Sequence, residues 1–100
     1  MTDLFDPPLT TRLKLRNKRG LHARASHKFV EKVSQFDAHV EVTSHNQVCA
    51  ETVVADSVME LLLLGSAVGE DITISASGPE AQDALEALKR LVETRFGEDD

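Results

Sequence analysis

Four segments of the chain alternate apolar with polar residues, a pattern that is typical of strands with one buried face. Leu13 and Leu15 alternate with basic residues in TRLKLRN, and Ile72 and Ile74 alternate with hydroxyl residues in DITISAS. The other two segments, AHVEV and VCAETVV, are rich in β-branched residues and flank SHNQ, which has the composition of a turn. We therefore predict strands at 11–17, 38–42, 48–54 and 71–77.

Apolar residues recur every three or four positions in three other segments, which predicts helices with one buried stripe. The first helix is expected over 23–35, and the last runs from Pro79 at its first position to Gly97 as its stop. Between them, DSVMELLLLG contains the capping-box pair Ser57 and Glu60 and ends in a glycine. The expected buried stripes are Ala25, Phe29, Val30, Val33 and Phe36 in the first helix, and Ala81, Ala84, Leu85, Leu88, Val92 and Phe96 in the last.

The predicted elements follow the order β-α-β-β-α-β-α, without repeats or low-complexity tracts. Since each strand has one apolar face and each helix one apolar stripe, the helices should cover one side of a single sheet. We expect an α+β fold, an open-faced two-layer sandwich with three helices on one face of a four-stranded antiparallel sheet. The domain is expected over 11–97, after a flexible arm at 1–10 and before an acidic tail at 98–100.

Composition narrows the classes of function. The 100 residues fit one domain, and the net charge of −6 with no Trp or Tyr argues against a nucleic-acid partner. Cys49 is the only cysteine, so we expect a small buried residue and neither a disulfide framework nor a cysteine-based metal cluster. The N-terminus lacks the pattern of a secretory signal, and the longest apolar run, Leu61–Leu64, is too short to span a bilayer. We therefore expect a cytoplasmic protein without membrane insertion.

A basic island, NKRGLHAR, stands out in this acidic chain and places His22 immediately before the first predicted helix. Backbone N–H groups at a helix start favour anions through hydrogen bonding and the helix dipole. Those of Ala23 and Arg24, together with the Arg24 guanidinium, would hold a phosphoryl group on His22. Gly20 gives the backbone freedom at this point. The basic residues that raise the local positive potential are Arg16, Lys18 and Arg19.

A neutral imidazole is a competent nucleophile near pH 7, and the loose transition state of phosphoryl transfer depends mainly on positioning and charge. His22 and Arg24 would therefore suffice for phosphoryl transfer without a metal ion. The residues alone also leave open a simpler interpretation, in which His22 is a polar residue that flanks a helix. We interpret His27, His39 and His45 as ordinary surface residues, because no pair of histidines has the H-E-x-x-H spacing of a metal site.

Three segments, in the same order along the chain, resemble the HPr family of phosphocarriers of the phosphoenolpyruvate-dependent phosphotransferase system. They are NKRGLHARASHKFVEKVSQFDAHVEV, DSVMELLLLG and GEDITISASGPEAQDALEAL. The G-[LI]-H-x-R core of the family is present as Gly20, Leu21, His22 and Arg24, and the likeness covers about 11–97. The predicted order of strands and helices is also the family's fold.

The resemblance implies that His22 accepts a phosphoryl group on Nδ1 from phospho-enzyme I and passes it to an enzyme IIA component, with Arg24 as its phosphate partner. Enzyme I uses phosphoenolpyruvate and Mg²⁺, so no bound cofactor is expected on this chain. We expect a monomer that acts as a carrier rather than as a free-standing enzyme. Two alternatives remain open: a regulatory module that keeps the fold without phosphotransfer, and a small acylphosphatase-like hydrolase, which the lack of clustered glycines disfavours.

The chain departs from the family pattern at two places. Ala25 stands where the family often has proline, and alanine is an excellent helix former that preserves the first turn. The stretch between the second strand and Ser57 is a few residues longer than usual, which leaves the register of the third strand, within 47–55, open. Two branches of the family serve sugar transport and nitrogen regulation. The segments LLLLGSAVG, SGP and FGEDD favour the nitrogen-related branch.

Ser57 and its helix are candidates for regulation and docking. As an N-cap, Ser57 would stabilise the short helix by about 1 kcal/mol. The resemblance adds regulatory phosphorylation by an HPr kinase in some lineages, which would place negative charge on the docking face. We expect Val58, Leu61 and Leu64 to enter the core. The residues expected to contact partners are Arg19, His27, Lys28, Met59 and Leu62.

Overall fold

The computed structural model describes residues 8–17, 19–45, 51–64 and 69–97. Within these ranges the elements are β1 Leu9–Lys14, α1 Ala23–Val33, β2 His39–Ser44, β3 Thr52–Val54, α2 Val58–Leu64, β4 Asp71–Ser77, α3 Ala81–Glu93 and a short 3-10 turn, η1 Arg95–Gly97. Their order confirms the predicted β-α-β-β-α-β-α succession. No helix in the described part of the chain is both long and apolar enough to cross a membrane.

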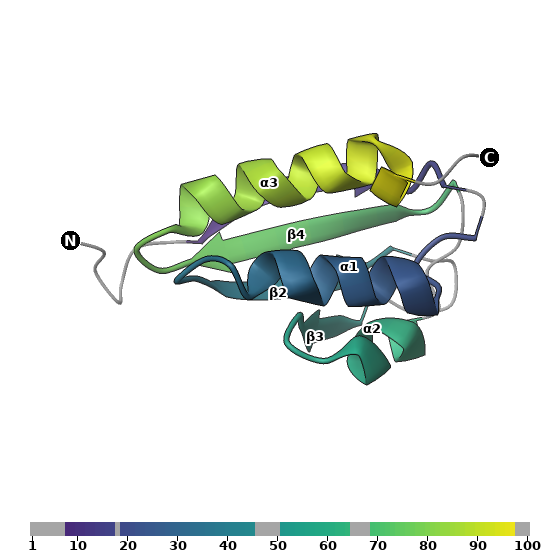
Figure 1. Ribbon diagram of the computed structural model, residues 1–100, viewed down its shortest axis with the longest axis horizontal. Coiled ribbons are helices and arrows are strands. Elements are labelled where there is room, and N and C mark those ends of the chain that lie inside the picture. Colours follow the sequence, from purple (N-terminus) through teal and green to yellow (C-terminus); the bar gives the residue numbers. More distant parts are fainter. Residues whose placement is uncertain (1–7, 18, 46–50, 65–68, 98–100) are drawn as a thin grey trace.

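The strands form one antiparallel sheet in the order β1-β4-β2-β3. Val42 of β2 lies opposite Ile74 of β4 and Val53 of β3, so apolar residues of neighbouring strands share one face. The long helices α1 and α3 run across that face, and α2 lies beside α1 (Figure 1). This arrangement is the predicted open-faced α+β sandwich.

The hydrophobic core lies between the sheet and the helices. Ile72 and Ile74 are fully buried, and they belong to the same apolar cluster as Phe29 of α1 and Leu88 of α3. Burial of each such side chain stabilises the fold by about 1.5–3 kcal/mol. The predicted helix stripes are confirmed, since every member is buried or packs half-buried against this cluster.

The first strand begins earlier than predicted, at Leu9. Leu9 pairs with Ala76 and Thr10 with Ser75, so the ladder with β4 extends into the segment 1–10 that we expected to be a flexible arm. The strand also ends earlier, at Lys14 rather than residue 17. The expected arm at 1–7 and the expected tail at 98–100 lie outside the described residues.

The register of the third strand is now defined, with Val42 opposite Val53 and Thr43 opposite Thr52. The described strand β3 is shorter than the predicted segment, of which 48–50 lie outside the described residues together with Cys49. Ser44, predicted to open a turn, instead ends β2 and is buried. Its backbone N–H donates to the Glu51 carbonyl at 2.8 Å, which continues the pairing toward β3.

The last helix is shorter than predicted at both ends. It starts at Ala81 rather than Pro79, because Glu80 has a non-helical backbone, with φ −111° and ψ 28°, and occupies the N-cap position. Glu80 also pairs with Asp37, since its backbone N–H donates to the Asp37 carbonyl and its side chain accepts from the Asp37 N–H. It ends at Glu93, and Arg95 and Phe96 adopt left-handed backbone angles before Gly97 does. This turn places Phe96 in the core, where it is 1% exposed. The first helix also ends two residues early, at Val33 rather than residue 35.

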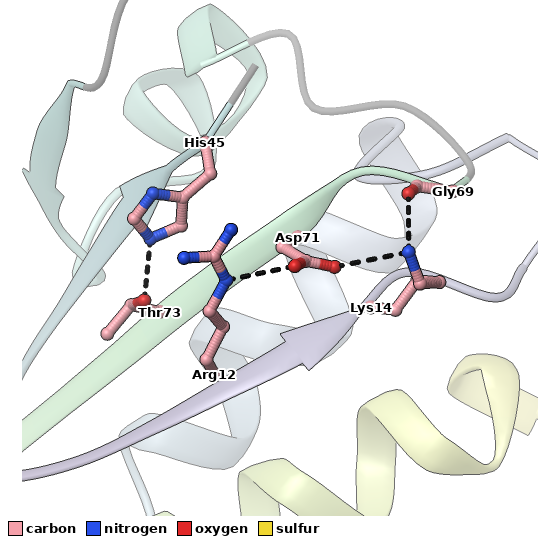
Figure 2. Close-up of polar contacts among 6 residues, drawn as sticks. All are labelled: Arg12, Lys14, His45, Gly69, Asp71 and Thr73. Carbon is pink, nitrogen blue, oxygen red and sulfur yellow. Dashed lines mark hydrogen bonds and ion pairs between the residues drawn. The ribbon is translucent and has the colours of Figure 1, made fainter.

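The opposite face of the sheet is polar. Arg12 Nε donates to Asp71 Oδ2 at 2.9 Å, and Lys14 Nζ lies 3.5 Å from the other carboxylate oxygen (Figure 2). The hydrogen bond from Arg12 lowers the pKa of Asp71 below its ordinary value, and the charge of Lys14 acts in the same direction. His45 Nε2 lies 2.6 Å from Thr73 Oγ1 beside this pair. We call these five residues the sheet-face cluster.

Candidate functional site

His22 is the residue immediately before α1 and occupies its N-cap position. Its backbone is extended, with φ −75° and ψ −178°, and the Arg24 backbone N–H donates to its Nδ1 at 3.2 Å. Since Nδ1 accepts this hydrogen bond, a neutral ring carries its proton on Nε2. The Nδ1 lone pair therefore faces the backbone donors at the start of the helix.

The expected phosphate-binding groups lie at this helix start. Ala23 and Arg24 form the first turn of α1 and are exposed. The first N–H groups of a helix have no acceptor within the helix, so they are suited to an anion. Arg19 is exposed on the preceding loop, whereas Lys18 lies outside the described residues. The roles of Ala23 and Arg24 in holding phosphate stay predictions.

The loop that leads to His22 has a defined path. Gly20 adopts φ +62°, a left-handed conformation that favours glycine, and Leu21 is anchored in the core at 3% exposure. Asn17 and Ser26 are buried polar residues next to the site, and we did not predict either of them from the sequence. The available signals were an asparagine three residues before a turn glycine, and a small polar residue beside Ala25 on the helix stripe.

The two expected docking residues on α1 have different surroundings. His27 is exposed, and its Nε2 lies 3.7 Å from Glu31 one turn later. Lys28 is half-buried, and its ammonium group donates to the Phe96 carbonyl at 2.5 Å. This bond ties α1 to the left-handed turn after α3, so the Lys28 ammonium group has a structural contact that the sequence did not indicate.

A shallow, open pocket of about 470 Å³ lies where α3 ends and the chain leaves β1. Four residues line it: Arg16, Glu93, Thr94 and Arg95. In Figure 1 this region and the start of α1 lie at the same end of the molecule. The two arginines therefore add positive charge to the end that carries His22.

The helix α2 lies beside α1 (Figure 1), and several of its apolar side chains are exposed. Leu61 and Leu64 are buried, as expected. Met59 and Leu62 are 67% and 36% exposed, while Leu63, which we did not predict, is 75% exposed. Successive helical residues are about 100° apart, so residues 62 and 63 both fall outside the side defined by 61 and 64. We call Met59, Leu62 and Leu63 the apolar patch.

Ser57 lies at the start of α2 and is half-buried. Its Oγ accepts a hydrogen bond from the Glu60 backbone N–H at 3.4 Å, which is one half of the predicted capping box. Val58, which we expected in the core, is only half-buried. Ser57 is therefore a helix cap, and its regulatory phosphorylation stays a prediction.

His39 and His45, which lie in and directly after β2, each contact a side chain of the sheet. His39 Nε2 lies 2.8 Å from Glu41 Oε2 on the same strand, and His45 contacts Thr73 in the sheet-face cluster. The described residues contain no group of three or more His, Cys, Asp or Glu side chains that could hold a metal ion. Among these residues, His22 is distinguished by its place at a helix start.

Comparison with known proteins establishes the family. The family model described as PTS HPr component phosphorylation site matches residues 9–94. The chain belongs to the HPr family. HPr of Cupriavidus necator is 37% identical over 82 residues, covering 82% of this chain and 88% of that protein. The phosphocarrier NPr of Escherichia coli strain K12 is 39% identical over 87 residues, covering 87% of this chain and 93% of that protein.

Solved structures of HPr share the fold. The crystal structure of HPr from Thermoanaerobacter tengcongensis has a TM-score of 0.82 at 33% identity and covers 92% of this chain and 99% of that chain. HPr from Bacillus anthracis has a TM-score of 0.79 at 32% identity. HPr-family proteins are phosphocarriers that work with enzyme I and enzyme IIA components, so membership assigns this chain to the phosphotransferase system.

Proposed function

We propose that His22 carries the phosphoryl group, bound to Nδ1. The observation that supports this most directly is the hydrogen bond from the Arg24 backbone N–H to Nδ1, at 3.2 Å. This bond orients the His22 ring so that the Nδ1 lone pair points toward the backbone N–H groups at the start of α1. The matched segment of the family model, which is described by its phosphorylation site, includes His22.

The proposed acceptance step needs no separate base. The Arg24 N–H releases Nδ1, and the Nδ1 lone pair then attacks phosphorus. The bond from phosphorus to the donor breaks as the N–P bond forms, while Nε2 keeps its proton. The Arg24 N–H then donates to a phosphoryl oxygen, and the Arg24 guanidinium adds a second, charged donor. Because the transition state is loose, these donors contribute mainly by positioning and by stabilising charge. In the return step, a group on the recipient attacks phosphorus and His22 leaves as neutral imidazole.

The donor in this proposal is phospho-enzyme I, and the recipient is an enzyme IIA component. Enzyme I uses phosphoenolpyruvate and Mg²⁺, so in this proposal the chain itself needs no cofactor. We further propose that it acts as a monomer in the cytoplasm. Partners dock on the exposed side chains near the start of α1 and on the apolar patch. Exposed apolar residues that include a methionine suit a surface that must fit several partners. The exposed docking residues are Arg19, His27, Met59 and Leu62, with Leu63 added by its exposure. Lys28 was also expected to dock partners, but it is half-buried and its ammonium group donates to the Phe96 carbonyl.

Of the two branches of the family, we favour the nitrogen-related one. The segments LLLLGSAVG, SGP and FGEDD support this choice. The test is to measure the rate of phosphoryl transfer from this protein to purified enzyme IIA of each branch. We expect faster transfer to the nitrogen-related component. Faster transfer to the sugar-specific component would contradict the assignment.

Phosphorylation with labelled phosphoenolpyruvate, Mg²⁺ and enzyme I tests the proposal. We expect one phosphate per chain, labile in acid and stable in base, that is absent from His22→Ala. His45→Ala is the matched control, because it removes a half-buried histidine of the sheet-face cluster. It should be labelled like the unmodified protein. Labelling that survives His22→Ala would contradict the proposal.

A further inference from the structure

Two fully buried polar side chains flank His22 in the sequence. Asn17 and Ser26 are both 0% exposed, and the only other buried polar residue in the described ranges is Ser44. Burial of a polar group costs free energy unless the group is hydrogen-bonded. The bonds that these two side chains make therefore indicate what their burial achieves.

Both side chains hold carbonyl groups of the loop that leads to His22. Asn17 Nδ2 donates to the Gly20 carbonyl at 2.6 Å, and Ser26 Oγ donates to the Leu21 carbonyl at 3.1 Å. The Ser26 backbone N–H also donates to the His22 carbonyl at 2.8 Å. Three successive carbonyl groups are thus held by two residues.

Ser26 holds both peptide planes that meet at the His22 Cα atom. The Leu21 carbonyl belongs to the plane before His22, and the His22 carbonyl belongs to the plane after it. With both planes held, the backbone angles of His22 are restricted to the observed extended conformation. Asn17 holds the preceding plane at Gly20, where the absence of a side chain would otherwise leave the loop free to change path.

The backbone angles of His22 decide where its ring lies relative to the first turn of α1. Nδ1 must stay within hydrogen-bond distance of the Arg24 N–H for its lone pair to face the backbone donors. Small misplacements of a reacting group slow a reaction that depends on positioning. Asn17 and Ser26 are fully buried, so their effect on such a reaction must pass through His22 rather than through contact with a partner.

We propose that Asn17 and Ser26 are positioning residues for phosphoryl transfer, because they hold the carbonyl groups around His22 and so keep Nδ1 directed at the start of α1. This inference rests on the proposed function of His22. It assigns a role in the reaction to two residues that touch neither the phosphoryl group nor the partner.

Ser26→Ala is the sharpest test, because it removes one oxygen atom and leaves the backbone bond to His22 in place. Ser34→Ala is the matched control, since Ser34 Oγ donates to the Glu31 carbonyl at 2.7 Å at the far end of the same helix. We expect Ser26→Ala to accept the phosphoryl group from phospho-enzyme I about tenfold more slowly, with Ser34→Ala unchanged. Equal rates for the two variants would overturn the proposal.

A measurement without enzyme I separates this inference from the proposed function. By NMR, the Arg24 amide of Ser26→Ala should exchange with solvent several-fold faster than in the unmodified protein, because its acceptor Nδ1 is less well placed. The same exchange rate should be unchanged in Ser34→Ala, and denaturant titration should show both variants folded. Asn17→Asp, which keeps the shape of asparagine but replaces its Nδ2 donor, should also speed exchange. An unphosphorylated native protein would refute the proposed function, whereas an unchanged Arg24 exchange rate in Ser26→Ala would refute the positioning role alone.

Discussion

His22 and His45 are both half-buried histidines, yet their rings have different surroundings. Arg24 lies two residues after His22 in the sequence, and Arg12 lies in the sheet-face cluster with His45. His45 follows β2 on the polar face of the sheet, and its ring contacts the Thr73 hydroxyl group. In the same cluster, Arg12 donates to Asp71. The ring of His22 instead accepts from a backbone N–H group at the first turn of α1.

The difference comes from the backbone rather than from the residue types. In a sheet, backbone donors are used by neighbouring strands, as when the His45 N–H donates to the Asp71 carbonyl. At a helix start, several N–H groups have no acceptor within the helix and point toward the residue before it. A histidine at that position therefore meets donors suited to a phosphoryl group, while a histidine at a strand end meets side chains.

Removing one arginine from each region should give the largest contrast. Arg24→Ala should slow phosphoryl transfer about tenfold or more, because a hydrogen bond to a charged group contributes about 1.5–3 kcal/mol. Arg12→Ala, which breaks the pair with Asp71 on the sheet face, should transfer at the rate of the unmodified protein. Single-turnover kinetics with phospho-enzyme I measures both rates, and circular dichroism checks the fold. Unchanged rates for Arg24→Ala would remove its assigned role.

A negative charge beside the apolar patch should have a smaller effect, on docking. Ser57→Asp places a charge at the start of α2 and should weaken binding to enzyme I several-fold, as the charge on a phosphoserine would. Ser34→Asp adds the same charge to an exposed position at the end of α1. Titration calorimetry gives both affinities. If the two variants bind equally well, Ser57 is only a helix cap.

The smallest effect is expected for the sheet-face cluster, which should change how the free energy of unfolding depends on pH in acid. Because the hydrogen bond from Arg12 lowers the pKa of Asp71, the folded protein keeps this carboxylate ionised at a lower pH than the unfolded chain does. The pair therefore stabilises the fold above the ordinary pKa of 3.8, and this contribution is lost as pH falls through the lowered value. Urea titrations between pH 6 and pH 2 should show a shallower acid loss for Asp71→Asn, with phosphoryl transfer at neutral pH unchanged. An identical pH profile would contradict the role of this pair.

The sequence predicted elements well where periodicity and flanking residues agree. The segment DITISAS alternates over its full length and forms β4 at the predicted bounds. The predicted end of α3 was wrong. We expected Gly97 to stop the helix, but α3 ends at Glu93 and the chain turns at Arg95 and Phe96, which have left-handed backbone angles. In that turn the Phe96 ring is buried in the core. The core is formed by residues far apart in the sequence, so local sequence pattern does not predict this burial.

The residues of the site also divide into those that local sequence predicts and those that depend on the packing of distant segments. Spacing and resemblance pointed to His22 and Arg24, because both lie in one short segment whose helix start could be predicted. Asn17 and Ser26 could not be assigned, since their partners are carbonyl groups whose directions follow from the path of the loop. Leu63 was missed for a related reason, because the orientation of the seven-residue α2 is set by its contacts with the rest of the molecule.

The most direct test of the central claim is the position of the phosphorus atom in the phosphorylated protein. Phosphorus-31 and nitrogen-15 NMR of protein phosphorylated by enzyme I identifies the bonded nitrogen. We predict an N–P bond at Nδ1 of His22, together with a change in the Arg24 amide resonance as its N–H turns from Nδ1 to a phosphoryl oxygen. Phosphate on Nε2 of His22, or on His45, would contradict the account.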